Sequence, residues 1–254
     1  MSSNFSGGFF IMKEIPVRVQ KFIAHAGICS RRKAEQSIKD GDVTINNLIA
    51  EIGDTINPGK DEVRLNGRLI TIPKVKEKVV LLMNKPKGFV CSNEDPHNPR
   101  TVFELLPKNY QKQRLYCAGR LDKESEGLLI ITNDGDLSQK VTHPSTKITK
   151  KYRVTIQKDL REEMVPKLLQ GRELEGDFLR FEKVIVGGKG DLAGKILEIH
   201  LHHGKKREIR RLLESYGFYV KKLRRFQIGK MILKKMAPGS VRELNNKEID
   251  LLFS

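Results

Sequence analysis

Residues 115–135 read LYCAGRLDKESEGLLIITNDG, a stretch that predicts how the chain folds around it. A strand-like segment at 115–118 enters, glycine and charged residues interrupt it, and the apolar run 128–131 leaves as a second strand. Asp122 is therefore expected on a loop between two buried strands, with Arg120 two residues before it. A carboxylate held on a loop by rigid flanking strands is suited to attack or deprotonate a bound substrate. Taken alone, the loop is more simply a polar turn, because Gly, Asp and Ser are ordinary turn formers.

The composition around this loop points to a polyanionic partner. The chain has 254 residues, enough for a sizeable core and for two domains, one of them small. It carries 48 Lys and Arg against 31 Asp and Glu, a net charge of +17. Basic clusters at 31–33, 205–211 and 221–225 favour nucleic acid over a surface that is merely soluble. The apolar stretches are far shorter than the roughly 20 residues of a membrane-crossing helix, so no membrane partner is expected.

The N-terminal residues and the cysteines predict a cytoplasmic protein. Residues 1–10 lack the basic start and the apolar core of a signal peptide, so export is not expected. We assign residues 1–15 to a disordered extension, within which Met12 is a second possible translation start. Cys29, Cys91 and Cys117 are odd in number and form no paired spacing, which is typical of free thiols in a reducing compartment.

Residues 16–72 form a self-contained unit with two helices followed by short strands. The apolar residues from Val19 to Ile23 recur at helical spacing and stop before Gly27. Ser30 can cap a second helix, 31–39. Arg31 and Arg32 lie in the first turn of that helix, where side chains and free backbone amides can both meet phosphate. The alternative is a solvated helix start.

The remainder predicts a short linker and an α+β domain. Residues 73–78 are polar and charged, as in a linker. In residues 79–254 strand-like runs outnumber helices and do not alternate with them regularly, which indicates an α+β sheet. Helices are expected at 102–106, 136–142, 160–169, 207–216 and 247–252.

The histidines and glycines indicate no metal and no cofactor. His200 and His202 would project to one face of a strand, but no third ligand of suitable type lies near them in sequence. The chain contains neither a phosphate-binding Gly-Lys loop nor a dinucleotide fingerprint. We therefore predict no metal site and no cofactor.

Two further groups of residues carry chemistry suited to nucleic acid. Arg207, Arg210 and Arg211 are three or four residues apart on a predicted helix and can line one face. That face can hold phosphate, pair with a carboxylate such as Asp122, or simply face solvent. Tyr152 begins a strand, where its ring is either a core residue or a surface on which an extruded base can stack.

These pieces together resemble a known family. Residues 16–72 resemble the small RNA-binding domain of the ribosomal-protein-S-four type, through the segments 19–24, 27–35 and 41–46. From about residue 16 to the C-terminus the chain resembles the RsuA/RluB/RluE/RluF family of ribosomal RNA pseudouridine synthases, and within this family it is most like the RluB-type large-subunit branch. The matching segments are 82–88, 100–102, 119–122, 125–129, 132–135, 143–144, 151–154 and 207–211. The resemblance implies a catalytic domain with a mixed, largely antiparallel sheet flanked by helices.

The same resemblance implies roles for individual residues. Asp122 would be the essential carboxylate, Tyr152 the ring that stacks on the target uracil, and Arg210 the partner of Asp122. Arg120 would occupy the position of the flipped-out nucleotide or hold the backbone. The further RNA contacts that we assign are Arg31, Arg32, Lys85, Arg207 and Arg211.

The implied reaction is the isomerisation of uridine to pseudouridine in ribosomal RNA by a monomer without cofactor or protein partner. Glu208, where other relatives have glutamine, favours the large-subunit branch, and Lys206 replaces an expected asparagine. Both departures weaken any assignment of the target nucleotide. Whether Asp122 attacks the nucleoside or removes a sugar proton stays open.

Three alternatives remain at this point. The first is a non-catalytic RNA-binding or ribosome-assembly factor, and the second is the same reaction on small-subunit ribosomal RNA or transfer RNA. The third is a glycosidase that pairs Asp122 with Glu124 or Glu126, against which the basic composition argues.

Overall fold

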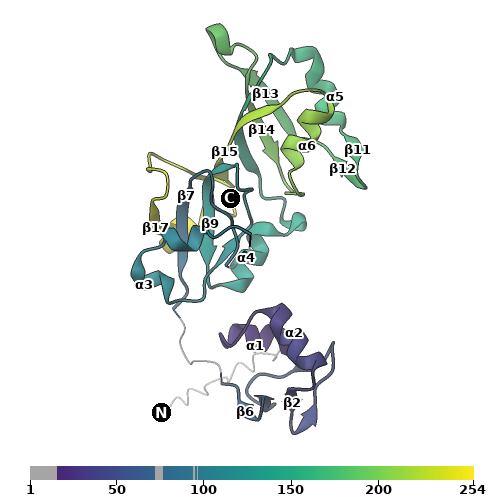
Figure 1. Cartoon of the computed structure of the whole chain (residues 1–254), viewed down its shortest axis with the longest axis vertical. Helices are drawn as coiled ribbons and strands as arrows, with labels where there is room; N and C mark the ends of the chain where they lie inside the picture. Colours follow the sequence, from purple (N-terminus) through teal and green to yellow (C-terminus); the bar gives the residue numbers. More distant parts are fainter. Residues whose placement is uncertain (1–15, 72–76, 94, 96) are drawn as a thin grey trace, which may run out of the picture. The chain divides into compact units, whose positions relative to one another are not determined.

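The computed structural model describes residues 16–71, 77–93, 95 and 97–254 (Figure 1). Their contacts separate two compact units, the N-terminal unit ending at Glu77 and the C-terminal unit beginning at Lys78. The extension predicted at 1–15 and most of the linker predicted at 73–78 lie outside the described residues. None of the described helices is long and apolar enough to cross a membrane.

The N-terminal unit has the two helices and short strands that the sequence predicts. Helix α1 spans Val19–His25 and α2 spans Arg31–Lys39, where the Ser30 hydroxyl accepts a hydrogen bond from the Lys33 amide at 3.1 Å. The antiparallel sheet β3-β2-β5-β6 follows, and β1 pairs with β4. The strands are β1 Val17–Arg18, β2 Val43–Ile45, β3 Leu48–Ile49, β4 Thr55–Ile56, β5 Val63–Leu65 and β6 Arg68–Leu69. Asn66 and Gly67 both have positive φ, as a tight hairpin turn requires.

The C-terminal unit is built on one mixed sheet in the order β13-β14-β10-β15-β9-β7-β17, with β16 paired to β15 and β8 to β9. Only the β15–β9 ladder among these described strands is parallel. The strands are β7 Val80–Lys85, β8 Tyr116–Ala118, β9 Glu126–Thr132, β10 Lys150–Ile156, β13 Lys183–Gly187, β14 Ile196–Leu201, β15 Val220–Ile228, β16 Met231–Ile232 and β17 Val241–Glu243. A separate hairpin joins β11 Arg172–Leu174 to β12 Asp177–Leu179. The predicted α+β class and the largely antiparallel sheet are confirmed.

The parallel junction depends on one glycine. Gly127 has φ +108°, and a Cβ built there would lie 2.1 Å from the Arg225 carbonyl oxygen. Only glycine lets β9 and β15 approach this closely, because any side chain would strike the opposing backbone. The sequence at Gly127 thus brings the Asp122 loop beside β15.

The helices differ in detail from the predicted segments. The segment at 102–106 is a 3-10 turn, Val102–Leu105, and 160–169 divides into a 3-10 turn, Glu162–Met164, and α5, Val165–Gln170. Helix α3, Lys108–Gln111, was not predicted. The remaining helices are α4 Gly135–Thr142, α6 Glu208–Ser215 and α7 Asn246–Asp250.

Helices α5 and α6 cover one face of the strands β13, β14, β10 and β15. Leu168 of α5 and Leu212 of α6 belong to the same buried cluster as Val154 and Ile199, whose side chains point to that face. Arg153 and Lys151 alternate with these core residues and therefore lie on the opposite face. This half of the sheet consequently has a helix-covered face and a polar one.

Candidate active site

The Asp122 loop lies between β8 and β9, as the sequence predicts. Gly119 begins it with φ +83°, a conformation that favours glycine. The Ser125 amide donates to the Asp122 carbonyl at 3.0 Å, which closes a turn across the carboxylate position. Asp122 is half-buried, and within the described chain its carboxylate forms no hydrogen bond or ion pair. The group is therefore held in place by its backbone while its oxygens stay available.

Lys85 supports this loop from below. Its side chain is completely buried at the end of β7, and its ammonium donates to the carbonyls of Ser125 at 2.8 Å and of Asp122 and Pro86 at 3.1 Å each. Burial lowers the pKa of Lys85, and the nearby Cys91 and Asp122 partly oppose that shift. No part of the side chain is left for RNA, so the predicted RNA contact gives way to a supporting role. The sequence signal for this supporting role was the position of Lys85 at the end of the apolar strand β7.

A cavity of about 680 Å³ lies over the loop. It is lined by four of the residues singled out in the sequence, Arg120, Asp122, Tyr152 and Arg207. Tyr152 is 6% exposed, and its ring belongs to the buried cluster of the helix-covered face. Arg120 and Arg207 are exposed. The cavity thus combines a carboxylate without a partner among the described residues, an aromatic wall and exposed cations that include Arg120 and Arg207.

Arg210 is buried beside the loop but is not bonded to the Asp122 carboxylate. Its guanidinium donates to the carbonyls of Glu124 at 3.2 Å and Val220 at 3.1 Å. Burial, and then the charge of Arg207, lower the pKa of Arg210, while the charge of Asp122 acts in the opposite direction. The predicted Asp122–Arg210 ion pair is thus replaced by a bridge from β15 to the loop, two residues after Asp122.

The arginines at the start of α6 point to different partners. Arg207 precedes the helix with φ +50° and lines the cavity, and no described residue bonds its guanidinium. Arg211 turns to the β11–β12 hairpin, where its Nη1 lies 2.9 Å from Asp177 Oδ2 and its Nη2 donates to the Leu174 carbonyl at 2.5 Å. The predicted common face is therefore divided: Arg207 faces the cavity and Arg211 is already paired.

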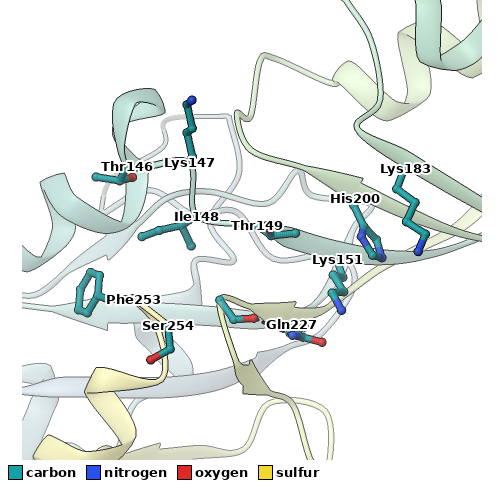
Figure 2. Close-up of a pocket in the computed structure, with 11 residues that line it drawn as sticks. Thr146, Lys147, Ile148, Thr149, Lys151, Lys183, His200, Gln227, Phe253 and Ser254 are labelled. Atoms are coloured by element: carbon teal, nitrogen blue, oxygen red, sulfur yellow. Dashed lines mark hydrogen bonds between the residues drawn. The ribbon is translucent and has the colours of Figure 1, made fainter.

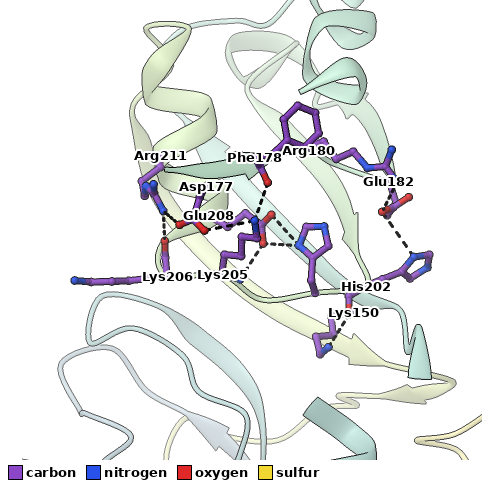
Figure 3. Close-up of polar contacts among 11 residues, drawn as sticks. Lys150, Asp177, Phe178, Arg180, Glu182, His202, Lys205, Lys206, Glu208 and Arg211 are labelled. Atoms are coloured by element: carbon purple, nitrogen blue, oxygen red, sulfur yellow. Dashed lines mark hydrogen bonds and ion pairs between the residues drawn. The ribbon is translucent and has the colours of Figure 1, made fainter. Parts of the chain in front are cut away.

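The loop before α6 is held by buried polar contacts (Figure 3). Glu208 is 3% exposed and binds His203 Nδ1 at 2.9 Å and the Lys205 amide at 3.1 Å. The Lys205 ammonium lies 3.4 Å from Asp177 of the hairpin. Glu208, noted in the sequence as a departure, therefore organises the loop that carries Arg207.

Two further buried cations were missed in the sequence. Arg225 is 2% exposed and donates through Nε to the Leu128 carbonyl at 2.8 Å. Lys150 donates to the His202 carbonyl at 3.1 Å, and burial together with Arg225 lowers its pKa to about 8 against the opposing effect of Glu208. The 221–225 cluster contained the signal for Arg225, but exposed and buried cations look alike in a sequence.

Two thiols share the cavity wall. Cys91 and Cys117 both line the cavity, and the Leu121 amide donates to the Cys91 sulfur at 3.5 Å. The pKa of Cys91 is lowered to about 6, first by its hydrogen bond with Cys117 and further by Leu121, Lys85 and Arg225, while burial opposes the shift. The pKa of Cys117 is raised by the same hydrogen bond. Of the two hydrogen-bonded thiols in the cavity wall, Cys91 is therefore the more acidic.

The remaining predicted residues lie elsewhere. Arg31 and Arg32 are exposed in the first turn of α2, in the N-terminal unit. His200 binds Glu198 at 2.7 Å and His202 binds the Thr149 hydroxyl at 3.2 Å. In the part of the chain that the structure describes, no three His, Cys, Asp or Glu side chains gather as metal ligands.

Comparisons with known proteins identify the families that the two units match. A family described as RNA pseudouridylate synthase matches residues 79–215, and the S4 domain matches residues 17–62. Ribosomal large subunit pseudouridine synthase B of Vibrio cholerae is 36% identical over 92% of this chain and 74% of its own length. An uncharacterized RNA pseudouridine synthase of Aquifex aeolicus is 36% identical over 93% and 94%, respectively.

Two further similarities cover the chain almost from end to end. The dual-specificity RNA pseudouridine synthase RluF of Escherichia coli K12 is 36% identical over 96% of this chain and 80% of its own length. A crystal structure of a pseudouridylate synthase superposes with a TM-score of 0.66 at 28% identity, over 93% of this chain and 99% of that one.

Proposed function

The chain belongs to the RNA pseudouridylate synthase family and carries an S4 domain, and from this we propose that it isomerises uridines of ribosomal RNA, with the large subunit as the favoured source. The observation that carries the proposal is the unpaired Asp122 carboxylate in a cavity walled by Tyr152. The printed names of the RluB relatives and the acidic Glu208 support the large subunit. The name of RluF, which states dual specificity, keeps a second RNA class open.

The reaction needs three events at one nucleotide. The bond from ribose C1′ to uracil N1 breaks, the base turns while bound, and C5 joins C1′. The C5 proton is then lost to solvent, and N1 takes up a proton in its place. Asp122 acts on the nucleoside directly, either by attack or by removing a sugar proton. Lys85 and Arg210 bond the carbonyls around it, so the loop does not have to be reorganised during the reaction.

The walls of the cavity suit an extruded base. A base inside a helix is unreachable, and flipping it out costs a few kcal/mol. Stacking on an aromatic ring such as Tyr152 returns roughly 1–3 kcal/mol. Arg120 and Arg207 are positioned to contact the phosphates or fill the gap left by the base.

The N-terminal unit supplies contacts away from the reacting base. Arg31 and Arg32 are exposed at the start of α2, where they can bind phosphate together with the first amides of the helix. We further infer a cytoplasmic monomer that acts without a protein partner, since all the residues that we assign to the reaction belong to this chain.

The direct test is release of tritium from ribosomal RNA labelled at uridine C5, with wild-type protein and with Asp122→Asn. We expect release by the wild type and none by the variant, while both bind RNA equally. Glu124→Gln is the matched control, because it removes an exposed carboxylate from the same loop, and it should retain activity.

Three outcomes would contradict the proposal. Binding without release by the wild type would instead identify a non-catalytic RNA-binding factor. Activity in Asp122→Asn would remove the carboxylate's role. Mapping pseudouridines in cells that lack the protein identifies the RNA and would exclude the large subunit if only other RNAs change.

A further inference from the structure

A second cavity, of about 460 Å³, lies on the polar face of the sheet (Figure 2). It is lined by Lys151 of β10, Lys183 of β13, His200 of β14 and Gln227 of β15. The strand register places Lys183 opposite His200, His200 opposite Lys151, and Lys151 opposite Gln227. Such cross-strand neighbours lie roughly 5 Å apart. The four side chains therefore form one continuous row across the sheet, which we call the cradle.

The cradle lies behind the catalytic cavity. Tyr152 and Lys151 are consecutive residues of β10, so their side chains point to opposite faces of the sheet. Tyr152 lines the catalytic cavity and Lys151 lines the cradle. The chain also links the two, since Thr142 lines the first and Thr146 the second. An extended ligand could thus follow the surface from one to the other.

The two lysines of the cradle have no partners among the described residues, whereas His200 is bonded to a carboxylate. Within the described chain, no hydrogen bond or ion pair involves the ammonium groups of Lys151 and Lys183, and Figure 2 shows them on either side of the His200 ring. The nearby carboxylate of Glu198 is bonded to His200 Nε2 at 2.7 Å.

Two lysines elsewhere in this unit have carboxylate partners. Lys205 lies 3.4 Å from Asp177, and Lys222 lies 3.3 Å from Glu126. Unpaired like charges lining one cavity repel each other and do nothing for the stability of the fold. An anion bound in the cavity would balance these charges and explain why they lie together.

We propose that Lys151, Lys183 and His200 bind a phosphodiester group of the RNA substrate, at a point outside the segment that enters the catalytic cavity. Compact ammonium groups suit a phosphate, which they bind as point charges. Arg153 and Arg224 lie directly opposite each other in the adjoining part of β10 and β15, and extend the positive surface along the sheet. This inference rests on the proposed function, because it takes RNA as the ligand.

The test compares two probes and three variants. The probes are a fluorescent transcript of large-subunit ribosomal RNA and a short stem-loop around the mapped target uridine. The variant Lys151→Gln/Lys183→Gln should bind the transcript several-fold more weakly at low salt. Its plot of log affinity against log salt should be less steep by about 1 to 2. Its affinity for the stem-loop, which fills only the catalytic cavity, should not change.

Matched variants separate this effect from a general loss of charge or of folding. Lys151→Arg/Lys183→Arg keeps both charges and should retain the wild-type salt slope. Lys112→Gln/Lys167→Gln removes two exposed lysines elsewhere in the unit, one of them on α5 of the helix-covered face, and should also keep that slope. If the double glutamine variant fails to fold, the single change at exposed Lys183 on the edge strand should still lower the slope by about 1.

An unchanged slope in the glutamine variants overturns the cradle, as does an equal fall in the Lys112 and Lys167 control. Loss of stem-loop binding in the double variant would also overturn the cradle, because it would show that the two lysines act on binding in the catalytic cavity. Failure of the proposed function has a different signature, namely no pseudouridine formation by the wild type.

Discussion

The cations beneath the Asp122 loop and those at the mouth of its cavity differ in what they contact. Lys85 and Arg210 are buried and donate to carbonyls of the chain itself. Arg120 and Arg207 are exposed and have no partner among the described residues. The buried cations hold the loop of the site in place, whereas the exposed cations are available to bind a ligand. In a chain of net charge +17, basic residues therefore cannot all be interpreted as RNA contacts.

The difference has an energetic cause. A buried carbonyl that loses its donor costs roughly 1–3 kcal/mol, and a buried cation must satisfy its protons within the fold. An exposed cation keeps its water until phosphate displaces the surrounding ions. Substitutions in the first group should therefore reduce stability and turnover, and those in the second should reduce affinity and its salt dependence.

The largest effect is expected at Lys85. Lys85→Met leaves the carbonyls of Ser125, Asp122 and Pro86 without their common donor, and should lower the free energy of unfolding by about 3 kcal/mol. Turnover should fall by about 100-fold or more, because displacement of a reacting group by about 1 Å has that effect. Urea unfolding and tritium release measure the two quantities.

Lys87→Met is the matched control, two residues away. Its ammonium is exposed and pairs with Glu124 at 2.9 Å on the surface, a contact that contributes about 0–1 kcal/mol. If the two substitutions had equal effects on stability and turnover, the buried and the exposed cations would not differ in their roles.

The second effect concerns pH and Lys150. Its pKa of about 8 in the folded protein lies below the 10.5 of a free lysine, so between these values the unfolded chain binds more protons. The stability contributed by this group therefore rises with pH across that window, by up to about 3 kcal/mol. The free energy of unfolding of wild type minus that of Lys150→Met should increase by this order from pH 7 to 10. A difference that is independent of pH would show that burial does not lower this pKa.

Such buried cations mark the limit of what the sequence could predict. Local signals were sufficient for the hairpin at Asn66-Gly67, for the capped helix α2 and for a loop that carries Asp122 between two strands. These features depend on neighbours in the chain. The sequence pattern also identified an α+β sheet, because the alternation of residues along a strand does not depend on its partner strand. The mixed, largely antiparallel pairing was implied by the family resemblance.

The acceptors of Lys85 and Arg210 could not be predicted in the same way. Lys85 bonds Ser125, 40 positions later, and Arg210 bonds Glu124, 86 positions earlier. A carbonyl has no side chain to signal its availability, so an arginine near a carboxylate was assigned to the carboxylate. The left-handed conformation of Arg207 arises likewise in a loop fixed by Glu208 and His203, and it separates Arg207 from Arg211.

The third prediction tests which acceptor Arg210 serves. Arg210→Lys keeps the charge but cannot span the carbonyls of Glu124 and Val220, since an ammonium lacks the planar fork of a guanidinium. If the role of Arg210 is to bridge the two carbonyls, Arg210→Lys should lose about 2 kcal/mol of stability. Its turnover should be about as low as that of Arg210→Gln. Substantial rescue by lysine would instead support a direct pairing with Asp122 during the reaction.

The smallest effects are expected at Arg207 and Arg211, one helical turn apart. Arg207→Gln should change the free energy of unfolding by less than about 0.5 kcal/mol, because the side chain contacts no described residue. RNA affinity should fall several-fold, with the salt slope less steep by about 1. Arg211→Gln should do the reverse: it loses the contacts to Asp177 and Leu174, so it should lower the free energy of unfolding more than Arg207→Gln does and leave the salt slope unchanged. Fluorescence anisotropy titrations at several salt concentrations measure RNA affinity, and urea unfolding of both variants measures stability. A less steep salt slope in Arg211→Gln would mean that the contact between Arg211 and the β11–β12 hairpin opens when RNA binds.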